Sequence, residues 1–235
     1  MGLELDSRML RAYQRMAADL RRVFEDRFVA LVAGRDGAAA AFAREIRTDD
    51  LEAMGALAST WHQEGLATPL LMTPGEFERS LDTFPGEYQA LIDQHVVIDG
   101  VSPLTHARVP PDDLRRACEA QARGHLIHLR QGWIDESGDE HGLARLIERS
   151  APPLRRVLMN LARLNGEALD GDATLAAFAE RRAGLPASLI TGILALERGH
   201  GASRAAASQA LVPRLGEYLA ASERLWSYID AWRPH

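Results

Sequence analysis

The sequence predicts an α+β fold, in which a small mixed sheet with helices is followed by an all-helical bundle. Short runs of β-branched and aromatic residues, typical of buried strands, occur only before Pro110. After Pro110, apolar residues recur at helical spacing to the end of the chain. We therefore predict two domains, residues 1–109 and 110–235. The chain has 235 residues, of which 46% are hydrophobic, and this is enough to bury a sizeable core.

The first domain is predicted to contain helices and three short strands. A helix over residues 6–27 begins where Asp6 and Ser7 can cap it, and its apolar residues recur at helical spacing. The apolar run 28–32 is a predicted buried strand that ends at the glycine-rich turn 34–37. A short helix is predicted to begin at Thr73, which can cap it, because Glu76 stands at the third helical position. The other predicted elements are a helical or irregular stretch over 38–46, a helix over 49–64, a strand over 68–73, helical residues over 88–94 and a strand over 95–100.

The second domain is predicted to be a bundle with helices near 112–132, 139–149, 152–165, 173–183, 187–198 and 203–233. Prolines separate most of them, because proline lacks the N–H that a helix interior needs. We expect Pro213 to kink the last helix rather than end it. Three aromatic residues near the end of the chain could anchor a homodimer through the helical half, or they could dock the last helix on the bundle: Trp226, Tyr228 and Trp232. We favour docking, because amphipathic helices usually bury their apolar stripe internally.

The composition excludes several classes of function. The net charge is -6 and the pI is about 5.8, so the chain has no overall electrostatic reason to bind nucleic acid or an anionic membrane. All its basic residues other than histidine are arginine, which excludes a P-loop lysine and a Schiff-base lysine. Cys118 is the single cysteine, so no intramolecular disulfide can form. Because the sequence shows neither a signal-peptide layout nor a membrane-length apolar run, we expect a cytoplasmic protein.

The order of elements resembles a known superfamily over most of the chain. Three segments carry this likeness: residues 28–34 with the closing Gly34, residues 67–73, and residues 80–88. A helix, a buried strand ending in glycine, further short strands and then a helical bundle resemble the nucleotidyltransferase superfamily. The likeness is to the bacterial branch of kanamycin nucleotidyltransferase and the minimal nucleotidyltransferases. The resemblance implies a nucleotide-sized cleft and, in active members, Mg²⁺ as the cofactor.

The residues that this family uses for catalysis are only partly matched. In the family, a Gly-Ser pair after the first strand opens a helix that holds phosphates, and two carboxylates on the next strand hold metal ions. Here Gly34 is in place, and Arg35 stands where the serine is expected. Asp50 and Glu52 have the metal-ligand spacing, but they begin the helix predicted over 49–64. We therefore favour the interpretation that they cap this helix.

The resemblance leads to two hypotheses about function. The first is a nucleotidyltransferase-like protein that is not catalytic and acts as a binding or regulatory module, with a nucleotide or a protein as its partner. The second is an active, Mg²⁺-dependent nucleotidyltransferase acting on a small molecule or a protein. In that case Asp50, Glu52 and Asp36 would be the metal ligands, and Gly34 and Arg35 would contact the nucleotide.

A third hypothesis rests on the second domain. Arg123 and His128 are separated by four residues, a spacing that resembles the Arg/His motif of the helical HEPN ribonucleases. The resemblance implies that His128 performs acid-base chemistry on an RNA 2′-hydroxyl while Arg123 steadies the phosphate. The alternative is an arginine and a histidine on the polar face of a helix. His125 and His128 could also face one metal ion, but the sequence shows no third ligand at helical spacing.

Overall fold

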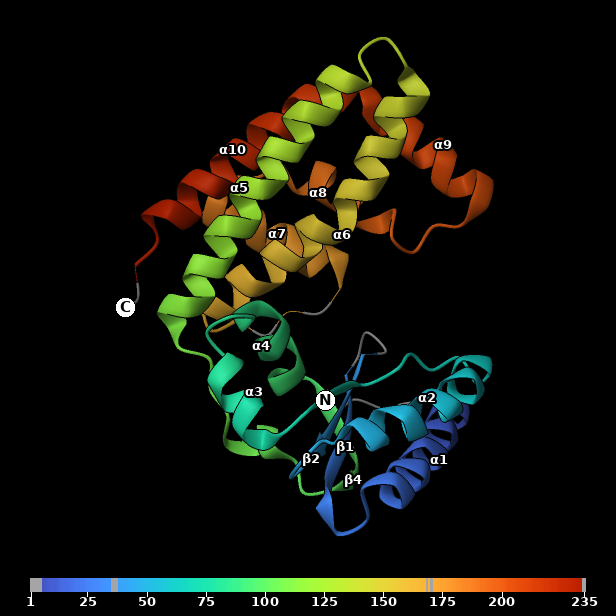
Figure 1. Ribbon diagram of the computed structural model, residues 1–235. Coiled ribbons are helices and arrows are strands. Elements are labelled where there is room, and N and C mark those ends of the chain that lie inside the picture. The colour runs from blue at the N-terminus through green and yellow to red at the C-terminus, as the bar shows by residue number, and fades with distance from the viewer. Residues whose placement is uncertain (1–5, 35–37, 168, 170, 234–235) are drawn as a thin grey trace. The chain divides into compact units, whose positions relative to one another are not determined.

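The computed structural model describes residues 6–34, 38–167, 169 and 171–233 (Figure 1). The chain divides into two compact units, Met1–Pro110 and Pro111–His235, and Pro110 is also where the sequence pattern changes. A four-stranded mixed sheet with helices forms the first unit, and helices form the second, which confirms the predicted α+β class. Among the helices of the described residues, none combines the length and the apolar character needed to cross a membrane.

The sheet of the first unit is built around one buried strand. Its strands are β1 (Phe28–Gly34), β2 (Ala39–Ala43), β3 (Leu70–Met72) and β4 (His95–Gly100), in the order β3-β2-β1-β4. β1 pairs antiparallel with β2 and β4, and β2 pairs parallel with β3. Six of the seven residues of β1 are buried, as expected for a strand covered on both faces.

The prediction of a helical or irregular stretch over 38–46 is wrong for the residues of β2. This strand is alanine-rich, and alanine has the strongest intrinsic helix propensity, so the local sequence carries no strand signal. Pairing decides the outcome instead, because β2 lies in register with β1, with Ala41 opposite Leu31. All five residues of β2 are buried, and their small side chains allow the covering helices to pack closely.

Helices cover both faces of this sheet. On one face, α1 (Ser7–Phe24) and α2 (Thr48–Gln63) pack on the odd-numbered residues of β2, and Trp61 donates a hydrogen bond to Asp19 at 2.9 Å. Phe42 points to the other face, where α3 (Pro74–Ser80) and α4 (Pro85–Asp93) supply Phe77 and Tyr88. The three rings stack edge to face, with centroids 5.7 and 5.1 Å apart. The predicted capping of α3 by Thr73 is confirmed by its hydrogen bond from the main chain of Glu76.

Two long helices organise the second unit. It contains α5 (Pro111–Asp135), α6 (Glu140–Leu164), α7 (Asp172–Ala183), α8 (Ala187–Ala195), α9 (Gly201–Leu211) and α10 (Leu215–Ala231). α5 packs against both α6 and α10, as Figure 1 shows. The single cysteine, Cys118, lies buried on α5, and burial raises the pKa of its thiol to about 12. Cys118 is therefore a packing residue and not a nucleophile.

Two helix boundaries predicted in the second unit are wrong. The helices expected over 139–149 and 152–165 form one continuous helix, α6, which runs through Pro152 and Pro153. Both prolines are exposed, while the apolar residues before and after them bury the same face of the helix, and this packing outweighs the lost main-chain hydrogen bonds. The helix expected over 203–233 is instead divided into α9 and α10 by a short 3₁₀ turn, Val212–Arg214, that contains Pro213.

Candidate functional site

Asp50 lies in the first turn of α2, where its carboxylate has two sets of partners. It accepts a hydrogen bond from the main-chain N–H of Arg47 at 2.8 Å, which satisfies a donor at the start of the helix. It also accepts two bonds from the guanidinium of Arg27, at 2.6 and 2.8 Å. The bonds from Arg27 are the main reason why the pKa of this buried carboxyl lies below its usual value. This geometry supports the interpretation of Asp50 as a helix cap.

The other predicted metal and nucleotide ligands do not gather around Asp50. Glu52 is exposed on α2, and side chains two positions apart on a helix do not face each other. Gly34 ends β1, whereas Arg35 and Asp36 lie outside the described residues. Within the described ranges, no group of three or more His, Cys, Asp or Glu side chains is placed to hold a metal ion. The structure therefore pairs Asp50 with Arg27 rather than with Glu52.

Arg123 and His128, the residues of the ribonuclease-like spacing, project in different directions from α5. The guanidinium of Arg123 lies over the ring of Trp226 on α10, with its carbon 5.8 Å from the ring centroid. His128 instead lines a cleft between α5 and α6. The fold brings Arg123 to an aromatic ring and His128 to a cavity, and it does not bring the two side chains together.

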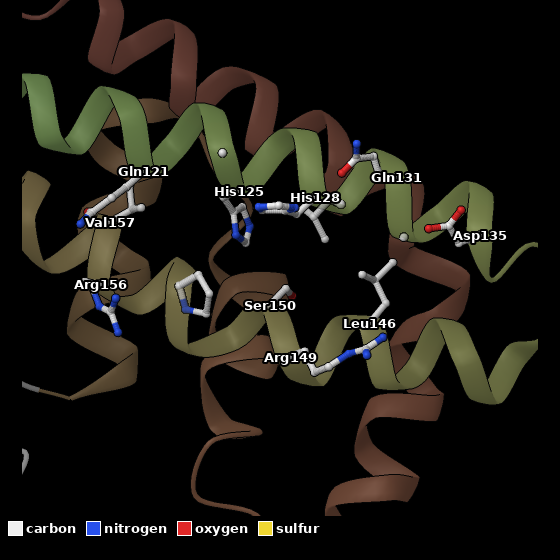
Figure 2. Close-up of a pocket in the computed structure, with 14 residues that line it drawn as sticks. Gln121, His125, His128, Gln131, Asp135, Leu146, Arg149, Ser150, Arg156 and Val157 are labelled. Carbon is white, nitrogen blue, oxygen red and sulfur yellow. The ribbon is translucent and has the colours of Figure 1, made fainter.

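A cleft with a volume of about 560 Å³ lies between α5 and α6 (Figure 2). Figure 2 shows Gln121 and Arg156 toward one end, Asp135 at the other, and two histidines facing α6 between them. The polar residues that line its two walls include Gln121, His125, His128, Arg149, Ser150 and Arg156. A concave site of this size with a few convergent polar groups is typical of small-molecule binding.

The floor of the cleft is a buried chain of hydrogen bonds that joins three helices. Nε2 of His125 on α5 lies 2.9 Å from the hydroxyl of Tyr218 on α10, and this hydroxyl lies 3.0 Å from Oγ of Ser150 on α6. Ser150 in turn donates to the main-chain carbonyl of Ile147 at 2.7 Å. Burial lowers the pKa of His125 to about 4, with a smaller contribution from His128, so the imidazole is neutral at neutral pH.

A second buried hydrogen bond, between Gln121 and Asn160, fixes the side chain of Gln121 at one end of the cleft. Oε1 of Gln121 accepts a hydrogen bond from Nδ2 of Asn160 at 3.2 Å. The Asn160 side chain is completely buried, and its oxygen accepts a bond from Arg163 at 2.8 Å. Because its carbonyl is held in this way, Gln121 keeps its amide N–H groups as the donors for a ligand.

The two arginines that line the α6 wall, Arg149 and Arg156, differ in whether an acidic side chain lies near them. Arg149 lies 3.6 Å from Oε1 of Glu136, which is longer than a hydrogen bond. Arg156 is exposed and makes no ion pair with any residue that the structure describes. Asp135 lines the opposite end of the cleft and is the single acidic residue among the lining residues. The cleft therefore has a net positive charge in a chain whose net charge is -6.

Two glycines of α5 shape the cleft in opposite ways. A Cβ atom at Gly132 would lie 2.4 Å from Cδ1 of Leu146, so glycine here lets α5 and α6 approach closely. A Cβ atom at Gly124 would meet nothing within 4 Å, so glycine here leaves the cleft open. The close approach at Gly132 closes the cleft near one end, and the absent side chain at Gly124 adds to its volume.

Sequence reasoning found only part of this site. It singled out His125 and His128, but it did not connect them with Arg149, Ser150 or Arg156 on α6. No protein-family model, curated protein or solved structure matches the chain. The resemblance to nucleotidyltransferases therefore stays a prediction.

Proposed function

We propose that the protein is a non-catalytic binding module, and that its helical unit takes a small anionic organic molecule in the cleft between α5 and α6. The observation that carries this proposal is the position of Arg149 and Arg156 on one wall, above the buried polar floor. A guanidinium keeps its charge at all physiological pH values and offers only donors, which suits phosphate and carboxylate groups.

The charge of the cleft favours an anion for a specific reason. Arg156 has no acidic partner in the described part of the chain, so an incoming anion does not have to displace one. Arg149 would have to give up only a long contact with Glu136. These two side chains lie seven positions apart on α6, which places them on the same face, separated by about 10 Å along the axis.

Two features support binding rather than catalysis. Asp50, the carboxylate best placed by spacing for metal-dependent transfer, is engaged by Arg27 and by the start of α2. In the cleft, Nε2 of His125 is already hydrogen-bonded to Tyr218. Asp50 would have to leave Arg27 before it could bind a metal ion, and Nε2 of His125 would have to leave Tyr218 before it could transfer a proton.

Titration calorimetry with inorganic phosphate, glycerol 3-phosphate and AMP tests this proposal. We expect at least one of these ligands to bind, and Arg156→Ala to weaken that binding about tenfold or more, because a charge-assisted bond is lost. Arg145→Ala, on the same helix but outside the cleft, is the matched control and should leave the affinity unchanged.

A second variant tests whether binding occurs in the cleft. Gly124→Leu places a side chain in the open space beside the cavity without removing any charge. We expect it to abolish binding while the circular dichroism spectrum stays that of the wild type. Failure of all three ligands to bind at millimolar concentration, or binding that survives this substitution, contradicts the proposed function.

A further inference from the structure

The direction of each hydrogen bond in the buried floor of the cleft follows from the main-chain carbonyl of Ile147, at the end of the chain of hydrogen bonds. A carbonyl oxygen only accepts, so Ser150 uses its single hydroxyl proton in the bond to Ile147. The hydroxyl of Tyr218 lies 3.0 Å from Oγ of Ser150, and two oxygens at that distance need a proton between them. Tyr218 therefore donates to Ser150, and its own oxygen is left to accept from Nε2 of His125.

This order determines where the single proton of the neutral His125 ring lies. If Nε2 carries the proton and donates it to Tyr218, then Nδ1 is unprotonated and acts as an acceptor. Nδ1 has no hydrogen-bond partner among the described residues, and the ring lines the cleft (Figure 2). The cleft thus presents one acceptor nitrogen from its floor, opposite the arginine donors of the α6 wall.

Pro153 removes a main-chain donor from the α6 side of the cleft. In a regular helix, the main-chain carbonyl of Arg149 would accept from the N–H four residues later, and proline has none. Pro153 lines the cleft, and residues four apart share a face of the helix. The carbonyl of Arg149 therefore lacks its regular helical donor.

We propose that Nδ1 of His125 is a specificity determinant, which accepts a hydrogen bond from a hydroxyl or amino group of the ligand. This inference rests on the proposed function and names the ligand class: an anion that also carries a donor, such as a hydroxylated phosphate ester, rather than an alkyl phosphate. A ligand without the donor would bury Nδ1 unpaired, and an unpaired buried polar group weakens binding.

The tautomer is tested first, without any ligand. Nitrogen NMR of the full chain with ¹⁵N-labelled histidine distinguishes protonated from unprotonated ring nitrogens, and comparison with His125→Phe assigns the signals of His125. We expect Nδ1 to be unprotonated and Nε2 to be protonated. In Tyr218→Phe the partner of Nε2 is lost, and we expect a mixture of both tautomers. A protonated Nδ1 in the wild-type protein overturns the inference.

A pair of ligands of nearly equal size tests the specificity. Glycerol 3-phosphate and propyl phosphate differ in two hydroxyl groups, and we expect the first to bind about tenfold more tightly. The Nδ1 signal should shift when glycerol 3-phosphate is added and stay in place with propyl phosphate. In His125→Phe, the two affinities should become equal.

The outcomes separate this inference from the proposed function. Equal affinities of the wild-type protein for the two phosphates refute the role of His125 but leave an anion site in the cleft. Binding of neither phosphate refutes this inference, and failure of inorganic phosphate and AMP as well refutes the proposed function. If His125→Phe does not fold, comparison with Tyr218→Phe assigns the His125 signals, and the tautomer and the two wild-type affinities still decide between the outcomes.

Discussion

Tyr218 on α10 and His125 on α5 are 93 positions apart in the sequence, yet the phenol oxygen lies 2.9 Å from Nε2 of the imidazole. Both side chains are buried, and the same phenol oxygen also contacts Ser150 on α6. The chemistry of the cleft therefore depends on the packing of three helices, and changes at this contact should alter both stability and binding.

The stability of the protein should decrease as the pH falls from 6.5 to about 4. The pKa of His125 is lowered from 6.5 to about 4 in the fold, so between these values the unfolded chain binds a proton that the native state excludes. The full effect, reached below about pH 4, is on the order of 3 kcal/mol. Urea denaturation at a series of pH values measures it.

His125→Phe is the control for this pH dependence. It removes the His125 imidazole and leaves the other ionisable side chains of the chain in place. We expect the difference in unfolding free energy between wild type and variant to change with pH in this range. Parallel curves for the two proteins would show that His125 titrates normally in the fold.

Asp50 and Glu52 should behave very differently when replaced. Asp50→Ala removes the carboxylate that accepts hydrogen bonds from the Arg27 guanidinium and from the main-chain N–H of Arg47. We expect it to lower the unfolding free energy by roughly 1 to 2 kcal/mol. Glu52→Ala changes an exposed residue and should stay within about 0.5 kcal/mol of the wild type. Chemical denaturation compares them. Stabilisation by Mg²⁺ that disappears in Asp50→Ala would instead show a metal site.

Gly100→Ala should destabilise the sheet more than Gly65→Ala. Both glycines have positive φ, +84° and +83°, so alanine is strained at either position, at about 1 kcal/mol. At Gly100, the added Cβ would also lie 2.0 Å from the main-chain oxygen of Val29, whereas nothing lies within 4 Å at Gly65. We expect Gly100→Ala to cost about 3 kcal/mol or more. Similar melting temperatures for the two variants would contradict the close approach of β4 to β1.

Pro153→Ala should stabilise the protein. A proline in a helix interior is unfavourable by about 3 kcal/mol relative to alanine, and Pro153 is exposed, so little packing is lost. We expect the unfolding free energy to rise by about 1 to 3 kcal/mol. Pro111→Ala is the control, since Pro111 is the first residue of α5 and its missing N–H is not needed there. A loss of stability in Pro153→Ala would mean that its ring supports α6.

The elements that were predicted correctly are those that depend on local patterns. α1, α2 and α5 follow from apolar residues at helical spacing, and α3 follows from the Thr73 capping box. The errors arise where distant contacts override local preference. β2 is alanine-rich and forms a strand because it pairs with β1, and α6 continues through two prolines because its buried face continues.

The sequence alone determined the α+β class, the change of pattern at Pro110, most helices and the absence of lysine and disulfide chemistry. These depend on residue type and spacing along the chain. Only the tertiary structure decided that Asp50 is bound by Arg27 and that His125 meets Tyr218. Which ring nitrogen of His125 carries the proton depends on the main-chain carbonyl of Ile147, which acts through the hydrogen bonds of Ser150 and Tyr218. Such a relationship exists only after three helices have packed together.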